Sequence, residues 1–282
     1  MPMSVKILVP VEDTEVSKAA EDACACLAKF VGAEVTLFHT TDISGVQYKN
    51  LTETLLDSIR VSARSTAHRY LTARSEAMAA RSGVLPRIVS MEGEPAECVI
   101  REAKRGYDLV VMGTEVHSDL RYMFLGSVSS SLIKESPIPV VVIKKNGPNL
   151  SQCIDGKPVK ALVAVDDSNA SRRCVEALAR LAIPNAFDIS LVHVMSKEFP
   201  TSKDPEATLD RNEKRLTLAG YTPDTILAEG DPGKVIAEIC EVEGFEMVIA
   251  GKSRGNELRE TPAMAVGHYL FHHSKAHQMI VP

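Results

Sequence analysis

Hydrophobic and polar residues form two kinds of block along the first part of this chain. Short, nearly continuous apolar runs occur at residues 5–11, 34–40, 85–92, 107–113 and 139–144, a pattern typical of strands buried on both faces. Between them, apolar residues recur at helical spacing over residues 17–31, 50–83 and 95–106, and again from residue 126. Strands that alternate with helices in this way predict a parallel sheet covered by helices on both faces.

The same pattern is written a second time. KILVPVEDTEVSKAAEDACACLA near the start matches KALVAVDDSNASRRCVEALARLA from Lys160, and EVTLFHT, MEGEPAECVIREAKRGYDLVVMG and ESPIPVVVI have counterparts that follow in the same order. The repeat is far longer than a solenoid unit, so it indicates a duplicated domain. We predict a first domain at 1–146, a second at 159–282, and a polar linker at 147–158 that contains glycine and proline.

Composition narrows the class of protein. The 282 residues are 45% hydrophobic and 24% charged, as in a soluble globular protein, and the net charge of -5 without a long basic run disfavours nucleic acid as a partner. The apolar runs are too short to cross a bilayer, and the first residues lack the apolar region of a signal peptide. Six scattered cysteines fit a reducing compartment. These features predict a cytoplasmic protein without a membrane span.

The polar segments that follow the strands are the candidate ligand sites. In a parallel sheet, ligands bind beyond the carboxyl ends of the strands, where VEDT, FHT and MGTE occur in the first half. The segment MGTEVHSDLRYMFLGS at 112–127 places Gly113 after a strand and Gly126 before a helix. Backbone N–H groups at such a helix start can hold an anion.

Taken together, these motifs resemble the universal stress protein family in its tandem form. Each half carries a V-D-x-S-like strand end, at 11–14 and 165–168, and a G-D/E-P turn, at 93–95 and 230–232, while S-P-x-P-V-x-V occurs at 136–142. The resemblance implies two tandem Rossmann-like α/β domains of the adenine nucleotide alpha hydrolase-like class, each with a five-stranded parallel sheet sandwiched by helices. It also implies an internal pseudo-dimer, in which Val140 to Ile143 pair with Gln278 to Val281.

The family's ATP-binding members carry G-x2-G-x9-G-(S/T) after the fourth strand. The first half keeps Gly113, Gly126 and Ser127, but Val116 replaces the second glycine, and Glu12 stands where the family uses aspartate at the adenine end. The second half keeps Gly251 and Asp166, whereas the rest of its motif is replaced by Arg254, Met264 and Ala265. The resemblance therefore implies a weakened ATP site in the first domain, with Mg²⁺ bound only together with ATP, and a degenerate site in the second.

The expected ligand contacts follow from these motifs. They are Val11, Glu12, Asp13, Met112, Gly113, Thr114, Val116, Gly126, Ser127, Val128, Asp166 and Gly251. We predict no catalytic residue, because GSVSS at 126–130 is not a nucleophile elbow. We also predict no metal site, because His268 and His272 share a helix face without an H-E-x-x-H pattern.

Three functions remain open at this point. The first is a stress-response binding protein in which a nucleotide biases conformation or assembly. The second is a slow ATPase in which Glu12 or Asp13 positions Mg²⁺ and water. The third is a nucleotide-free scaffold that holds an apolar metabolite.

Overall fold

The computed structural model describes residues 4–42, 52–114, 126–150, 156–197, 202–252 and the C-terminal segment, whose backbone is described from residue 262 and whose side chains from residue 266. The strands of the first half are β1 (Lys6–Pro10), β2 (Glu34–Thr41), β3 (Arg87–Glu92), β4 (Leu109–Thr114) and β5 (Val140–Lys144). Its helices are α1 (Glu15–Val31), α2 (Glu53–Ser82), α3 (Pro95–Ala103) and α4 (Ser127–Glu135).

The second half repeats this order of elements. Its strands are β6 (Val159–Ala164), β7 (Phe187–Met195), β8 (Asp224–Glu229), β9 (Met247–Gly251) and β10 (His277–Val281). Its helices are α5 (Asn169–Leu181), α6 (Pro205–Leu218), α7 (Pro232–Glu243) and α8 (Pro262–His273), with a short 3₁₀ helix at Pro184–Ala186. The α/β fold with two parallel-sheet halves is therefore confirmed.

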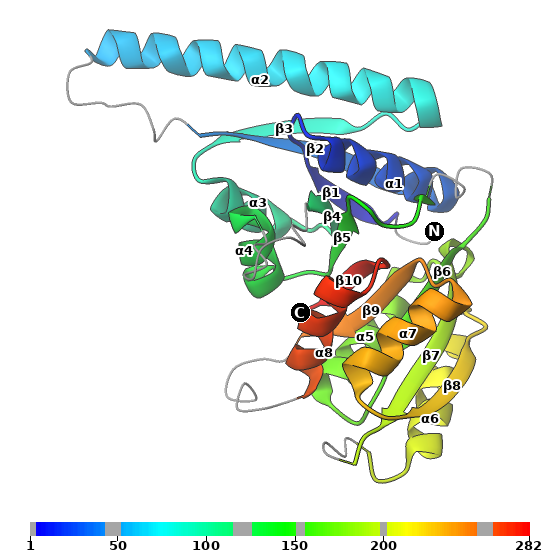
Figure 1. Ribbon diagram of the computed structural model, residues 1–282. Coiled ribbons are helices and arrows are strands. Elements are labelled where there is room, and N and C mark those ends of the chain that lie inside the picture. Colours follow the sequence, from blue (N-terminus) through cyan, green and yellow to red (C-terminus); the bar gives the residue numbers. More distant parts are fainter. Residues whose placement is uncertain (1–3, 43–51, 115–125, 151–155, 198–201, 253–261) are drawn as a thin grey trace.

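The two halves share one sheet (Figure 1). Its strand order is β3-β2-β1-β4-β5-β10-β9-β6-β7-β8, and the β5–β10 contact is antiparallel whereas the other neighbours are parallel. Val142 lies opposite Gln278, and Val141 lies opposite Met279. The pseudo-twofold axis thus passes the Val141–Met279 pair. The predicted pairing of the last strands is confirmed, and it satisfies the N–H and C=O groups of two edges that would otherwise be open.

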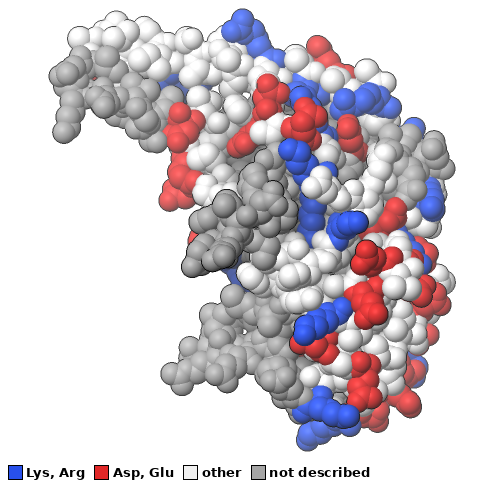
Figure 2. Space-filling view, in the orientation of Figure 1, with Lys and Arg blue, Asp and Glu red and all other residues white. Residues whose placement is uncertain are grey.

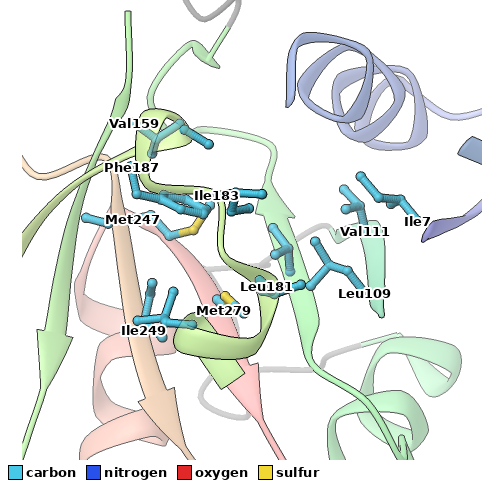
Figure 3. Packing of buried hydrophobic residues seen from close by; sticks show 14 of the residues in the cluster. Ile7, Leu109, Val111, Val159, Leu181, Ile183, Phe187, Met247, Ile249 and Met279 are labelled. Atoms are coloured by element: carbon cyan, nitrogen blue, oxygen red, sulfur yellow. The ribbon is translucent and has the colours of Figure 1, made fainter. Parts of the chain in front are cut away.

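The core is continuous between the halves on one face of the sheet. Buried residues of α1, α2, α5 and α6 belong to the same hydrophobic cluster, whereas the opposite face carries one cluster under α3 and α4 and another under α7 and α8. Figure 3 shows Ile7 and Val111 of the first half and Ile249 and Met279 of the second in this shared layer. The halves therefore pack as one body as well as through strand pairing.

A buried lysine and a buried histidine reinforce the junction. Lys144 Nζ donates hydrogen bonds to the carbonyls of Leu270 (3.1 Å) and Ser274 (2.7 Å) at the end of α8, where a cation offsets the helix dipole. His277 Nδ1 accepts the Lys144 backbone N–H (3.1 Å), so the ring proton is on Nε2, which donates to the Pro148 carbonyl (2.8 Å). The two side chains therefore fix the start of the linker against the second half.

Helix boundaries depend on capping residues as well as on apolar spacing. Thr14 caps α1 by accepting the Ser17 N–H (3.2 Å), and Ser168 caps α5 in the same way. The apolar pattern predicts the first helix from residue 17, two residues after its observed start, because the polar first turn contributes nothing to that pattern. The long helix predicted over 50–83 is observed as α2, and Figure 1 shows it extending past the edge of the sheet.

Candidate functional site

Both halves build the same turn at the carboxyl end of their first strand. The Glu12 N–H donates to Ser17 Oγ (2.9 Å), and the Asp166 N–H donates to Ser171 Oγ (2.9 Å). Behind each turn, a histidine ring contacts a strand-end carbonyl: His39 Nδ1 lies 2.9 Å from Val11 O, and His193 Nδ1 lies 2.8 Å from Val165 O. The carboxylates at 12 and 166 therefore start from equivalent backbone positions.

The acidic side chains after the first strand form different hydrogen bonds and ion pairs in the two halves. Glu12 and Asp13 are exposed, and Asp13 Oδ1 is 3.6 Å from Lys18 Nζ. In the second half, Asp166 accepts the Ser168 N–H (2.9 Å), and Asp167 accepts hydrogen bonds from Thr208 (2.8 Å) and Arg211.

Burial acts to raise the pKa of the Asp167 carboxyl, but these hydrogen bonds outweigh it and hold that pKa below its usual value. The acidic pair of the second half is thus tied into the fold by α6.

Gly113 and Gly251 allow a close approach of backbone to backbone. A Cβ on Gly113 would lie 2.1 Å from the Val16 carbonyl oxygen, and one on Gly251 would lie 2.1 Å from the Ala170 carbonyl oxygen. Each glycine therefore lets the first turn of α1 or α5 pack directly on the fourth strand of its half. This packing explains why Gly251 persists where the rest of the motif is replaced, and it holds whether or not phosphate binds.

The N-terminus of α4 differs from the other described helix starts. Gly126 is the N-cap residue with φ -53°, and no side chain of the described residues caps the helix. The helices whose N-caps are described otherwise have side-chain caps, from Thr14, Thr52, Glu94, Ser168, Asp204 and Asp231. Gly126 and Ser127 are both exposed, so the first N–H groups of α4 are available to an external acceptor.

The matching helix of the second half starts at a different position. α8 begins at Pro262, about one turn before Ala265, the counterpart of Ser127. The free N–H groups that follow Gly126 in α4 therefore have no counterpart at the aligned positions of α8.

The second half has a cavity at this edge. A cavity of about 60 Å³ is lined there by residues from β6, β7, α7, β9 and α8, among them Asp166, Val192, Ile236, Ala250 and Val266. This volume is well below the roughly 300–1,000 Å³ of typical small-molecule sites. The described walls therefore accommodate only a small group.

Larger side chains stand at the matching positions of the first half. Phe38 aligns with Val192 and Met112 aligns with Ala250, and both larger side chains are buried in the cluster under α3 and α4. The motif-based prediction missed this difference because it followed glycines and acids and ignored side-chain volume. An alignment of the two halves position by position carries the signal.

The remaining predicted contacts are distributed unevenly around this edge. Val11 is buried and Val128 is half-buried, whereas Val116 lies outside the described residues. Thr114 is buried at the end of β4, and its hydroxyl has no hydrogen-bond partner among the described residues. Thr114 is therefore a predicted contact residue whose buried hydroxyl is not used by the described residues.

The late histidines form a ring cluster on α8. The His268 and His272 rings are 4.5 Å apart, edge to face, and burial lowers the pKa of His272 below its usual value. Within the described part of the chain, no three His, Cys, Asp or Glu residues are grouped as metal ligands. The absence of a metal site stays a prediction.

Both halves of the chain match one protein family. The model of the universal stress protein family matches residues 3–144 and again residues 159–282. The universal stress protein YxiE of Bacillus subtilis is 32% identical over 148 residues, which are 49% of this chain and 98% of that protein. A universal stress protein of Methanocaldococcus jannaschii is 30% identical over 144 residues, covering 50% of this chain and 82% of the relative.

Solved structures match the whole length of the chain. The crystal structure of a universal stress protein from Archaeoglobus fulgidus covers 98% of this chain and 97% of its own, with a TM-score of 0.73 at 18% identity. A protein from Pseudomonas aeruginosa covers 99% of this chain and 93% of its own, with a TM-score of 0.57 at 11% identity. These similarities concern the fold. None of the described helices combines the length and apolar character needed to cross a bilayer.

Proposed function

Because this chain belongs to the universal stress protein family, we propose that it is a stress-response binding protein that holds one adenine nucleotide in its first half. The observation that carries the proposal is the N-terminus of α4, where Gly126 and Ser127 are exposed and no side chain in the described part of the chain caps the first N–H groups. Such a helix end attracts phosphate through N–H donors and the helix dipole together. The Thr114 hydroxyl, at the end of β4, has no hydrogen-bond partner among the described residues and could supply a further donor at the carboxyl edge of the sheet.

Several residues should make this binding weak. Phe38 and Met112 occupy space that the second half leaves to smaller side chains, and Glu12 and Val116 replace the family's aspartate and glycine. We expect a dissociation constant no better than roughly micromolar on the usual affinity scale.

The second half should not hold the phosphates. Met264 and Ala265 replace the Gly-Ser pair, and α8 begins about a turn earlier. Each charge-assisted hydrogen bond that is lost weakens binding by about 1.5–3 kcal/mol. One nucleotide per chain is therefore the proposed stoichiometry.

Calorimetry with ATP tests the proposal directly. Gly126→Val should weaken binding by about tenfold or more and Ser127→Ala by several-fold, because both change groups at the helix start. Ser131→Ala, farther along the same helix, is the matched control and should bind as wild type. Two sites per chain, undiminished binding by Gly126→Val, or no binding by the wild type would each refute the proposal.

The same samples separate binding from hydrolysis. If Glu12 or Asp13 positioned Mg²⁺ and water, phosphate release would occur and would disappear in Glu12→Gln and Asp13→Asn. We expect no turnover above the rate of the double variant. Reduced, buried cysteines among the described residues support the cytoplasm as the proposed compartment.

The cavity of the second half favours a second candidate function, the binding of a small, largely apolar ligand there. Its walls include Ala164, Ala250 and Val192, and Asp166 provides a single polar anchor. Mass spectrometry of ligands that remain bound through purification tests this function. Ala250→Met copies the first half at this position and should abolish such a ligand, whereas Gly126→Val should leave it in place.

A further inference from the structure

A second cavity lies at the opposite edge of the sheet in the first half. It has a volume of about 180 Å³ and is lined at the amino ends of β1, β2 and β3 and at the turn after α3. Its lining residues are Lys6, Glu34, Thr36, Arg87, Glu102, Arg105, Gly106 and Tyr107. Because nucleotide is proposed at the carboxyl ends of the strands, this cavity is spatially separate from the site described above.

A buried carboxylate is among the groups that line this cavity. Glu102 is 4% exposed, and its Oε1 accepts a hydrogen bond from the Tyr107 hydroxyl (3.0 Å). Its Oε2 has no hydrogen-bond donor among the described residues, although Arg105 Nε lies 3.4 Å away as an ion-pair partner. The arginine offsets the charge but leaves an acceptor unfilled, which is costly for a buried oxygen.

Two cations complete the lining. Neither Lys6 nor Arg87 forms an ion pair with another described residue, and both are exposed. Glu34 adds one negative charge to the same lining. The cavity therefore combines an unfilled buried acceptor with two unpaired positive groups.

The second half has different residues at the positions that line this cavity in the first half. Ile239 and Phe245 replace Glu102 and Tyr107, and Asp224 replaces Arg87. There Lys160 lies over the Phe245 ring at 4.6 Å and donates to the Glu243 carbonyl (2.7 Å). The fold thus does not require the buried acid, which makes its presence in the first half a specific feature.

We propose that this cavity binds a small zwitterion with the dimensions of an α-amino acid. Its ammonium group lies against the carboxylates of Glu102 and Glu34, and its carboxylate is held by Lys6 and Arg87. Its volume of about 180 Å³ is below the roughly 300–1,000 Å³ of typical drug-sized ligand sites, so the cavity suits a small ligand. A simple anion would meet Glu34 and Glu102, and a simple cation would meet Lys6 and Arg87, so both charges on one ligand match the lining best.

Three probes of similar size test the inference on the full chain. L-alanine carries both groups, propionate lacks the ammonium, and ethylamine lacks the carboxylate. Ligand-observed NMR should detect L-alanine with an affinity of about 1 mM or tighter and the other two at least about tenfold more weakly. Equal binding of propionate or of inorganic phosphate, or no binding of L-alanine, would overturn the proposal.

Variants locate the binding. Glu102→Gln should weaken L-alanine about tenfold to a hundredfold, because a charged acceptor is lost. Glu97→Gln on the exposed side of α3 is the matched control and should have no effect. Arg87→Ala, an exposed change, provides the same test if the buried variant fails to fold, and wild-type affinity in both would refute the site. Gly126→Val should bind L-alanine normally, which keeps this test independent of nucleotide binding.

Discussion

At the scale of single residues, two glycines that belong to a ligand motif are required by packing. Gly113→Ala and Gly251→Ala should each destabilise the protein by about 1–3 kcal/mol, because the new Cβ would collide with the carbonyl of Val16 or Ala170. Urea unfolding measures the effect. Because Gly251 lies in the half with the degenerate motif, equal losses of stability identify packing as the reason for both glycines. A neutral Gly251→Ala would contradict this account.

The residues of the site were only partly predictable from sequence. Thr14 and Ser168 could be identified as helix caps because such caps precede apolar-periodic segments. The engagement of Asp167 by Arg211 could not, since those residues are far apart in sequence and meet through α6. Lys144 was equally hidden, because a lysine at a strand end is ordinarily exposed.

At the scale of elements, the N-terminus of α4 separates stability from ligand binding. Gly126 has φ -53°, which any L-residue can adopt, so Gly126→Asp should supply the missing cap and a favourable charge at the helix dipole. We expect a gain of a few tenths of a kcal/mol in the free energy of unfolding. The same carboxylate would occupy and repel the phosphate position, so ATP binding should vanish. Calorimetry and urea unfolding on one sample set would reveal these opposite changes.

The order of elements was predictable because each strand and helix has its own apolar period. The relative position of the helices was not. Periodicity places one helix from residue 126 and His268 and His272 on another, but it does not show that α8 begins about a turn earlier than α4 relative to the motif. That offset is a difference between the two halves in where the helix after the fourth strand begins. It determines which backbone N–H groups are free at the helix start.

At the scale of the whole molecule, one sheet and one shared core predict a single unfolding transition. The β5–β10 pairing and the cluster beneath α1, α2, α5 and α6 connect the halves, so neither should unfold alone. Calorimetry should give one peak, with equal calorimetric and van't Hoff enthalpies. Two resolved transitions would show that the halves are independent. On the face shown in Figure 2, both signs of charge are interspersed. The absence of a nucleic-acid partner stays a prediction.

The junction also makes stability depend on pH. Burial lowers the pKa of His277 to about 4 from an ordinary value of 6.5, so the unfolded chain binds more protons between these two values. Stability should therefore be full above about pH 6.5 and should fall as the pH is lowered toward about 4. At about 1.4 kcal/mol per pKa unit, the loss is at most about 3.5 kcal/mol.

Lys144 makes the stability of the protein depend on pH in a second range, at high pH. Burial lowers its pKa to about 8 from 10.5, while the carbonyls of Leu270 and Ser274 favour the charged form. Because the unfolded chain again binds more protons between the two values, stability should rise from about pH 8 toward pH 10.5. Lys144→Met removes the titrating group and should flatten this rise.

Urea unfolding at several pH values, with two histidine variants, shows whether His277 causes the loss of stability in acid. His277→Asn keeps an acceptor near the Lys144 N–H but cannot become an imidazolium, so the slope between about pH 6.5 and 4 should become shallower. His68→Asn changes an exposed histidine of α2 and should retain the wild-type slope. If both variants kept that slope, its cause would be other groups, such as His272 or carboxylates, and His277 would not be the group that makes the junction sensitive to acid.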